Sequence, residues 1–177
     1  TDPVLNCVHN DHFESLRLWL RDGVDVYISP DSIVHFVFLS TRKRLHLRVT
    51  QPLIECLEWF DGSASVSELE ARYSSEASSL ESDHASSFRD FVQYLYEKGV
   101  LVRKNWMHDA FPPKYVARFS RQLNFFLDIE ESAAAASALL QKIMELKVAL
   151  IGVGAVGSWI LKELVQIGFQ RFVLVDP

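Results

Sequence analysis

Three glycines between residues 152 and 157 carry the clearest chemical signal in the sequence. Gly152, Gly154 and Gly157 have the spacing G-x-G-x-x-G and directly follow an apolar run that starts at Val148. In this spacing one glycine makes a tight turn, one lets the backbone approach a phosphate, and one lets the next helix pack closely on the strand. The N–H groups at the start of that helix would face an anion. The pattern predicts a nucleotide-binding loop; the alternative is a tight strand-to-helix turn that binds nothing.

A second apolar run places an acid where a nucleotide-binding fold needs one. Residues 172–175 predict a strand, which ends at Asp176. In such folds an acid about twenty residues past the glycine loop holds a ribose hydroxyl. Strand, loop, helix, strand and acid together predict the first βαβ part of a Rossmann-like α/β domain. One βαβ unit cannot cover both faces of its sheet, so we expect the chain, which stops at Pro177, to be a truncated piece of a longer enzyme.

Composition narrows the classes of function. Apolar residues make up 49% of the chain and charged residues 23%, which is typical of a soluble globular protein. The net charge is −5, with the excess of acid before Asn105, which argues against a general nucleic-acid surface. No apolar run is long enough for a membrane span, and no secretion signal opens the chain. We therefore expect a cytoplasmic protein with neither nucleic acid nor membrane as a partner.

Metal and disulfide chemistry find little support in the sequence. Cys7 and Cys56 do not form a C-x-x-C pair, so a zinc site or a disulfide framework is not predicted. His9 and His12 have H-x-x-H spacing, but a metal site needs further ligands and none is evident nearby. We predict no metal site in this sequence.

The first part of the chain, residues 1–104, predicts a small α+β domain. Leucines alternate with polar or aromatic residues from Leu16, which predicts a strand over 16–21. Asp22-Gly23 favours a type I′ hairpin turn into a return strand at 24–28; a helix over 12–21 is the alternative. A basic turn at 41–44 separates two more strands, and residues 74–87 predict a polar loop. Further expected elements are strands at 34–39, 45–49 and 100–102 and helices at 50–60, 65–73 and 86–98. Ser65 and Glu68 predict a capping box at the start of the second of these helices, and Gly99 is expected to end the third.

Several short motifs give this first domain a family resemblance. It has a winged-helix-like order of elements and resembles the PqqD-like domains that recognise the leader region of ribosomally made precursor peptides. The resemblance covers residues 34–102 and lies in Phe38–Arg44, Trp59–Gly62, Val66–Leu69 and Leu95–Leu101. It implies that a leader peptide adds a strand to an exposed sheet edge and lies against the third helix. The implied peptide-binding residues are Arg44, Leu45, His46, Leu47 and Arg48 on the edge and Val92 and Tyr96 on the helix.

Two other interpretations of this domain remain open. A winged helix with a purely structural role would bind no ligand. A DNA-binding winged helix should carry a basic recognition helix, whereas the helix expected at 86–98 has charges of both signs.

Residues 105–131 predict a linker followed by an arginine-bearing helix. Pro112 and Pro113 stiffen the linker and stop a preceding helix. A helix is expected over 117–126, and an alanine-rich helix over 132–145 leads into the strand before the glycine loop. Residues 132–177 are then the incomplete start of a nucleotide-binding domain.

The segment Arg118-Phe-Ser-Arg-Gln122, followed by the glycine loop and Asp176, resembles the start of a ThiF/MoeB-type adenylating domain of the ubiquitin-activating-enzyme superfamily. That family activates a carboxylate with Mg-ATP, forming an acyl-adenylate and pyrophosphate. The resemblance places Gly152, Gly154 and Gly157 beside the nucleotide and Asp176 on its ribose. It makes Arg121 the catalytic residue, reaching the phosphates of the neighbouring subunit in a homodimer, while Arg118 and Gln122 shape the helix and the dimer contact. The Mg²⁺ ligands and any Zn²⁺ cysteines of the family are expected beyond Pro177.

Both resemblances together suggest a function. A leader-recognition domain before a ThiF-like domain resembles microcin C-type peptide adenylating enzymes and the ThiF-like partner proteins of azole-forming peptide pathways. The first hypothesis is an ATP-dependent adenylyltransferase that modifies a precursor peptide held by its leader, with this fragment inactive alone. The alternative is a non-catalytic scaffold that delivers the peptide to a partner modifying enzyme. A third, weaker interpretation is an NAD-dependent enzyme with an unrelated N-terminal domain.

Overall fold

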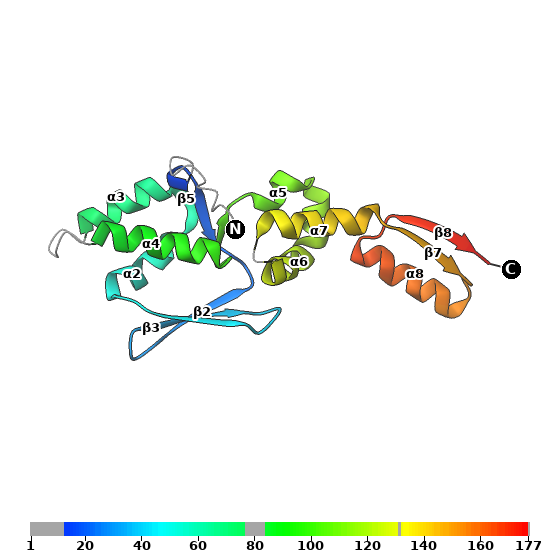
Figure 1. Ribbon diagram of the computed structural model, residues 1–177, viewed down its shortest axis with the longest axis horizontal. Coiled ribbons are helices and arrows are strands. Elements are labelled where there is room, and N and C mark those ends of the chain that lie inside the picture. The colour runs from blue at the N-terminus through cyan, green and yellow to red at the C-terminus, as the bar shows by residue number, and fades with distance from the viewer. Residues whose placement is uncertain (1–12, 77–83, 131, 177) are drawn as a thin grey trace, which may run out of the picture. The chain divides into compact units, whose positions relative to one another are not determined.

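The computed structural model describes residues 13–76, 84–130 and 132–176, without the side chains of 84–86. Contacts divide the chain into two units, Thr1–Asn105 and Trp106–Pro177, and each is described by itself (Figure 1). Both units combine helices with small sheets, so the chain is of mixed α and β class.

The first sheet of the first unit is assembled from strands far apart in the sequence. β1 (Arg17–Leu20) lies between β5 (Asp61–Ser65) and β6 (Leu101–Arg103) and is antiparallel to both. The strand predicted at 16–21 is thus confirmed and the helix alternative is wrong. The hairpin prediction is also wrong, because β1 does not pair with the strand that follows it. Gly23, with φ of +89°, instead turns the chain from one sheet into the other.

The second sheet is a three-stranded antiparallel meander. It consists of β2 (Val24–Ser29), β3 (Ile33–Phe38) and β4 (Arg44–Arg48), with β3 in the centre. One face is apolar and is covered by helices of the same unit (Figure 1), and the other face is turned away from them. Side chains alternate between these faces, as the period of two in the sequence predicts.

Helices and turns of the first unit follow the sequence signals with shifted boundaries. The single helix predicted at 50–60 is a short α2 (Gln51–Glu55) that tightens into the 3₁₀ helix η1 (Cys56–Trp59), and Thr50 makes no side-chain cap. Helix α3 (Val66–Glu76) and helix α4 (His84–Glu97) both extend into the stretch predicted as a loop. Gly99 ends α4 with φ of +68°, as expected for a helix stop.

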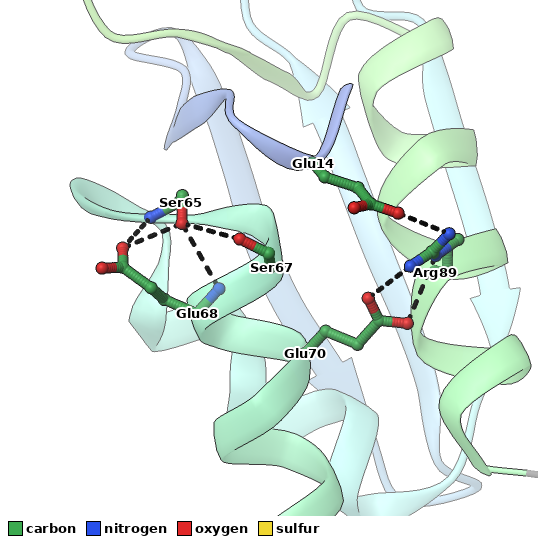
Figure 2. A network of polar contacts seen from close by, with 6 residues as sticks. All are labelled: Glu14, Ser65, Ser67, Glu68, Glu70 and Arg89. Carbon is green, nitrogen blue, oxygen red and sulfur yellow. Dashed lines mark hydrogen bonds and ion pairs between the residues drawn. The ribbon is translucent and has the colours of Figure 1, made fainter. Parts of the chain in front are cut away.

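A polar network fixes the start of α3 and ties it to α4 (Figure 2). The Ser65 N–H donates to the Glu68 carboxylate at 2.7 Å, and the Glu68 N–H donates to the Ser65 hydroxyl at 3.3 Å. This reciprocal pair is the capping box that the sequence predicts. Arg89 of α4 forms ion pairs with Glu70 of α3 at 2.7 Å and with Glu14 at 2.9 Å. The guanidinium therefore holds three segments of the first unit together.

The core of the first unit joins both sheets to the helices. Its fully buried large side chains come from strands of both sheets, from α3 and α4, and from the turn after α4: Leu18, Val34, Phe36, Val66, Tyr73, Phe88, Val92, Leu95, Val100 and Leu101.

The second unit is a helical segment followed by one βαβ element. A short helix α5 (Trp106–Ala110), absent from the sequence prediction, precedes the two prolines, and helix α6 (Pro113–Glu130) starts at the second of them. Helix α7 (Ala133–Glu145) begins after Ser132, whose hydroxyl accepts from the Ala135 N–H at 3.4 Å. The predicted βαβ element is present as β7 (Lys147–Ile151), α8 (Ala155–Ile167) and β8 (Arg171–Val175), with parallel strands.

No helix in the described ranges is both long and apolar enough to cross a membrane.

Candidate functional site

The glycine loop lies at the carboxyl ends of two parallel strands. Residues 147–151 of β7 pair in register with 171–175 of β8, so Ile151 stands beside Val175. The Gly152 N–H continues this pairing and donates to the Val175 carbonyl at 2.7 Å. The strand that leads into the loop and the strand that leads into Asp176 therefore end side by side, where α/β sheets bind ligands.

The three glycines of the loop are needed for three different reasons. Gly152 has φ of +85°, a conformation that disfavours any side chain. A Cβ at Gly157 would lie 1.9 Å from the Gly152 carbonyl oxygen, so only glycine allows α8 to pack this closely on the loop. A Cβ at Gly154 would meet nothing within 4 Å. The space beside Gly154 is open, which is where the fingerprint expects the backbone to meet a phosphate.

Asp176 and Ser158 hold this loop in shape. The Val153 N–H donates to Oδ1 of Asp176 at 2.8 Å, across 23 residues of sequence. The Ser158 hydroxyl lies 2.7 Å from the Val153 carbonyl and 2.8 Å from the Gly154 carbonyl. The sequence prediction gave Ser158 no role, although a serine one turn into a helix commonly bonds back to the carbonyl four residues earlier.

The first turn of α8 has backbone N–H groups without a side-chain cap. Gly154 is the residue that precedes the helix and it has no side chain to accept from them. The first N–H groups of a helix have no partner within the helix, and the helix dipole favours an anion there. Open space at Gly154 and uncapped N–H groups thus fit a phosphate group.

The two arginines of the 118–122 segment have different surroundings. The Arg118 guanidinium donates to the Val165 carbonyl at 2.9 Å and so binds α6 to the last turn of α8. Arg121 is exposed on α6 and forms no ion pair with any described residue. Gln122 is half-buried on the same helix. No hydrogen bond or ion pair among the described residues connects Arg121 with the glycine loop.

A cavity of about 570 Å³ lies at the other end of α8 from the glycine loop. It is bounded by α6 and by the turn between α8 and β8, and Arg118 and Lys114 contribute its charged groups. Because α8 has 13 residues, about 20 Å separates this cavity from the loop. The cavity is therefore not the predicted nucleotide site.

The predicted peptide-binding residues are divided by the structure. Arg44, Leu45, His46, Leu47 and Arg48 form β4, which among the described strands pairs with β3 alone and so is an edge of its sheet. Tyr96 is half-buried and meets the ring of Phe13 edge-on, with centroids 5.8 Å apart. Val92 has no exposed surface and belongs to the core, so it is not available to a peptide. This corrects the prediction for Val92: its place in the apolar face of α4 serves packing.

Other candidate groups carry no site. Cys56 is buried, its thiol donates to the Leu53 carbonyl at 3.1 Å, and burial raises its pKa to about 12. His9 and His12 lie outside the described residues. Within the described ranges, no group of three or more His, Cys, Asp and Glu residues could hold a metal ion.

The loop is a glycine-rich turn between the first strand and the helix of a βαβ element, with open space beside Gly154. Residues 119–177 match the ThiF family, so this part of the chain is ThiF-like. That match includes Arg121, the glycine loop and Asp176.

One solved structure shares the fold. It is titled "Crystal Structure of SeMet PaaA", superposes with a TM-score of 0.61 at 18% identity and covers 87% of this chain. This chain spans 44% of that chain's length. No curated protein matches the sequence closely enough to count as a relative.

Proposed function

We propose that this chain belongs to an enzyme that uses ATP to adenylate a carboxylate of a ribosomally made precursor peptide, which its first unit binds through the leader. The observation that carries the proposal is the glycine loop in the ThiF-like region. Space is open beside Gly154, the N–H groups at the start of α8 have no side-chain cap, and Asp176 accepts a hydrogen bond from the loop at the Val153 N–H.

The loop residues divide the work of holding a nucleotide. The N–H groups at the start of α8 hold phosphate oxygens in the open space beside Gly154. Asp176 uses Oδ1 to fix the Val153 N–H, which leaves Oδ2 to accept from a ribose hydroxyl. A carboxylate oxygen of the peptide then attacks the α-phosphorus, and pyrophosphate leaves.

Arg121 is the residue proposed to act on the phosphates. It is exposed and has no ion-pair partner among the described residues, so its guanidinium is free to meet the phosphates bound by a second subunit. An arginine suits this role, because it is always charged and its planar fork matches phosphate oxygens.

Mg²⁺ accompanies ATP in reactions of this class and offsets phosphate charge. The residues described here offer no ligand cluster for it. We propose that its ligands lie outside the residues that the structure describes.

The direct test is ATP–pyrophosphate exchange by the full-length protein with and without its precursor peptide. The proposal expects radioactive pyrophosphate to enter ATP only when the peptide is present. Peptide binding without exchange would contradict catalysis and favour the scaffold that delivers the peptide to a partner enzyme. Binding of NAD without binding of ATP would overturn both hypotheses.

A further inference from the structure

The backbone pairing of β4 shows which of its groups are unpaired. The Phe38 N–H donates to the Lys43 carbonyl at 2.9 Å, and the Val49 N–H donates to the Ser32 carbonyl at 3.3 Å. Hydrogen-bonded and non-hydrogen-bonded pairs alternate in an antiparallel ladder. The odd-numbered residues of β4 are therefore the ones whose backbone groups hydrogen-bond to β3. The N–H and C=O groups of Arg44, His46 and Arg48 therefore point away from β3, at the open edge of the sheet.

The two faces of β4 differ in chemistry. Arg44, His46 and Arg48 have exposed side chains on the face turned away from the core. Leu45 and Leu47, on the other face, are half-buried against the core. The edge thus presents two arginines and a histidine on one face and two leucines on the other.

The His46 ring lies at the end of a row of three rings that crosses the sheet. Tyr27, His35 and His46 face one another on successive strands. The rings of Tyr27 and His35 lie parallel with centroids 4.5 Å apart, and those of His35 and His46 are 6.2 Å apart. Cross-strand ring pairs of this kind stabilise a sheet, so the edge strand is pre-ordered for pairing.

We infer that the β4 edge selects an extended peptide of about five residues in which acidic and apolar side chains alternate. A strand added to β4 places its side chains in line with those of β4 on each face. Residues opposite Arg44 and Arg48 are then acidic, and residues opposite Leu45 and Leu47 are apolar. This inference rests on the proposed function, since it describes the leader segment that the first unit would bind.

Charge decides between the possible occupants of the edge. Arg44 and Arg48 form no ion pair with any described residue, so an acidic strand gains contacts that the unit itself does not supply. A second copy of β4 would bring arginines against arginines. Like charges on an edge strand repel a second copy and so prevent self-pairing. The opposite edge, β2, carries Asp25 on the same outer face and would repel an acidic strand.

The experiment uses the full chain and fluorescently labelled peptides with measurement of fluorescence anisotropy. The probes are a peptide with the core Glu-Val-Glu-Val-Glu, its lysine counterpart, and a version with the same residues in blocks. We expect the alternating acidic peptide to bind at least about tenfold more tightly than either of the others. Arg44→Glu combined with Arg48→Glu should reverse this preference in favour of the lysine peptide. Equal affinity for all three peptides, or an unchanged preference in the double variant, would overturn the inference.

A proline tests whether the open edge itself makes the contact. His46→Pro removes an N–H that points away from β3, so the β3–β4 ladder is kept while the donor to the peptide is lost. Ile28→Pro is the matched control, because the Ile28 N–H points away from β3 at the other edge. We expect about a tenfold loss for the first variant and none for the second. Equal effects of the two variants, or concentration-dependent dimers through β4, would contradict the assignment.

Failure of the inference and failure of the proposed function give different results. If the natural leader binds but arginine reversal leaves its affinity unchanged, the charge rule is wrong and leader recognition stands. If exchange of pyrophosphate is absent while the acidic peptide binds with the expected preference, the edge assignment stands and adenylation fails.

Discussion

Single residues explain why the glycine loop has its sequence. Gly154→Val should leave the fold intact, because φ at Gly154 is −63° and a Cβ there meets nothing within 4 Å. The larger side chain fills the space proposed for phosphate, so ATP affinity should fall at least about tenfold. Calorimetric titration with ATP and thermal unfolding of the full-length protein measure the two effects separately. Unchanged ATP affinity would count against the loop.

Gly157→Ala tests the close packing of α8 on the glycine loop. The added Cβ would lie 1.9 Å from the Gly152 carbonyl oxygen, so we expect overpacking to lower the free energy of unfolding by about 1–3 kcal/mol. Gly154→Ala is the matched control, because its Cβ meets no atom within 4 Å, and it should cost less than about 1 kcal/mol. Thermal unfolding measures both, and a Gly157→Ala protein as stable as the unchanged one would contradict this packing role.

Cys56 offers a second test at the level of one side chain. Burial raises its pKa to about 12, so the thiol stays protonated and unreactive in the folded state. In a Cys7→Ser background, we expect labelling by a disulfide reagent at pH 8 only as fast as the protein unfolds. Because the pKa is raised on folding, its contribution to the free energy of unfolding is present below 9.0 and declines as pH rises from there towards 12. Rapid labelling of the native protein would contradict the burial.

At the level of elements, several features that depend on local sequence were predicted correctly, whereas the pairing of β1 was not. The capping box at Ser65, the stop at Gly99 and the glycine loop depend on neighbours within a few residues, and the structure confirms them. The hairpin at Asp22-Gly23 failed because β1 pairs with β5 and β6, whose residues are about 40 and 80 positions away. Alternation identifies a strand but does not identify its partner.

The capping box gives a pH-dependent prediction. The Ser65 backbone N–H and hydroxyl hydrogen-bond the Glu68 carboxylate and lower its pKa below 4.5. The lowered pKa contributes stability above 4.5 that is lost as pH falls through the folded-state value. We therefore expect Glu68→Gln to lower the melting temperature at pH 7, with the difference disappearing in acid.

Two further variants serve as controls for the Glu68→Gln experiment. Ser65→Ala removes the cap and should cost about 1 kcal/mol at pH 7. Glu58→Gln, at an exposed position of η1, should change stability by less than about 0.5 kcal/mol. A melting difference for Glu68→Gln that persists unchanged at pH 3 would show that its carboxylate charge is not involved.

For the whole molecule, sequence spacing located the glycine loop but could not decide which side chains are accessible. Val92 has the period of a helix face, and the same period that suggests a binding face also builds a core. The family resemblance assigned different roles to Arg118 and Arg121, but it did not predict that Arg118 donates to the Val165 carbonyl near the end of α8. Accessibility and partners depend on contacts between distant residues, which a single sequence does not display.

The difference between these arginines allows the proposed dimer mechanism to be tested. Arg121→Ala in the full-length enzyme should slow pyrophosphate exchange about a hundredfold or more while leader affinity is unchanged, because the proposal assigns the exposed guanidinium to the phosphates alone. Arg118→Ala should instead lower the melting temperature, since it removes the contact with Val165. Equal loss of exchange and leader binding in Arg121→Ala would contradict the assignment.

A mixed dimer then shows whether Arg121 acts on its own subunit or on the neighbouring one. A Gly154→Val protomer keeps its Arg121 but should bind ATP at least about tenfold more weakly, whereas an Arg121→Ala protomer should bind ATP but lacks the arginine. Each variant alone should be nearly inactive, and co-expression should restore exchange, because one site of the mixed dimer then combines an intact loop with the partner's intact arginine. If purified mixed dimers stay inactive, Arg121 does not work across the interface, since the loop and the arginine would have to come from the same chain.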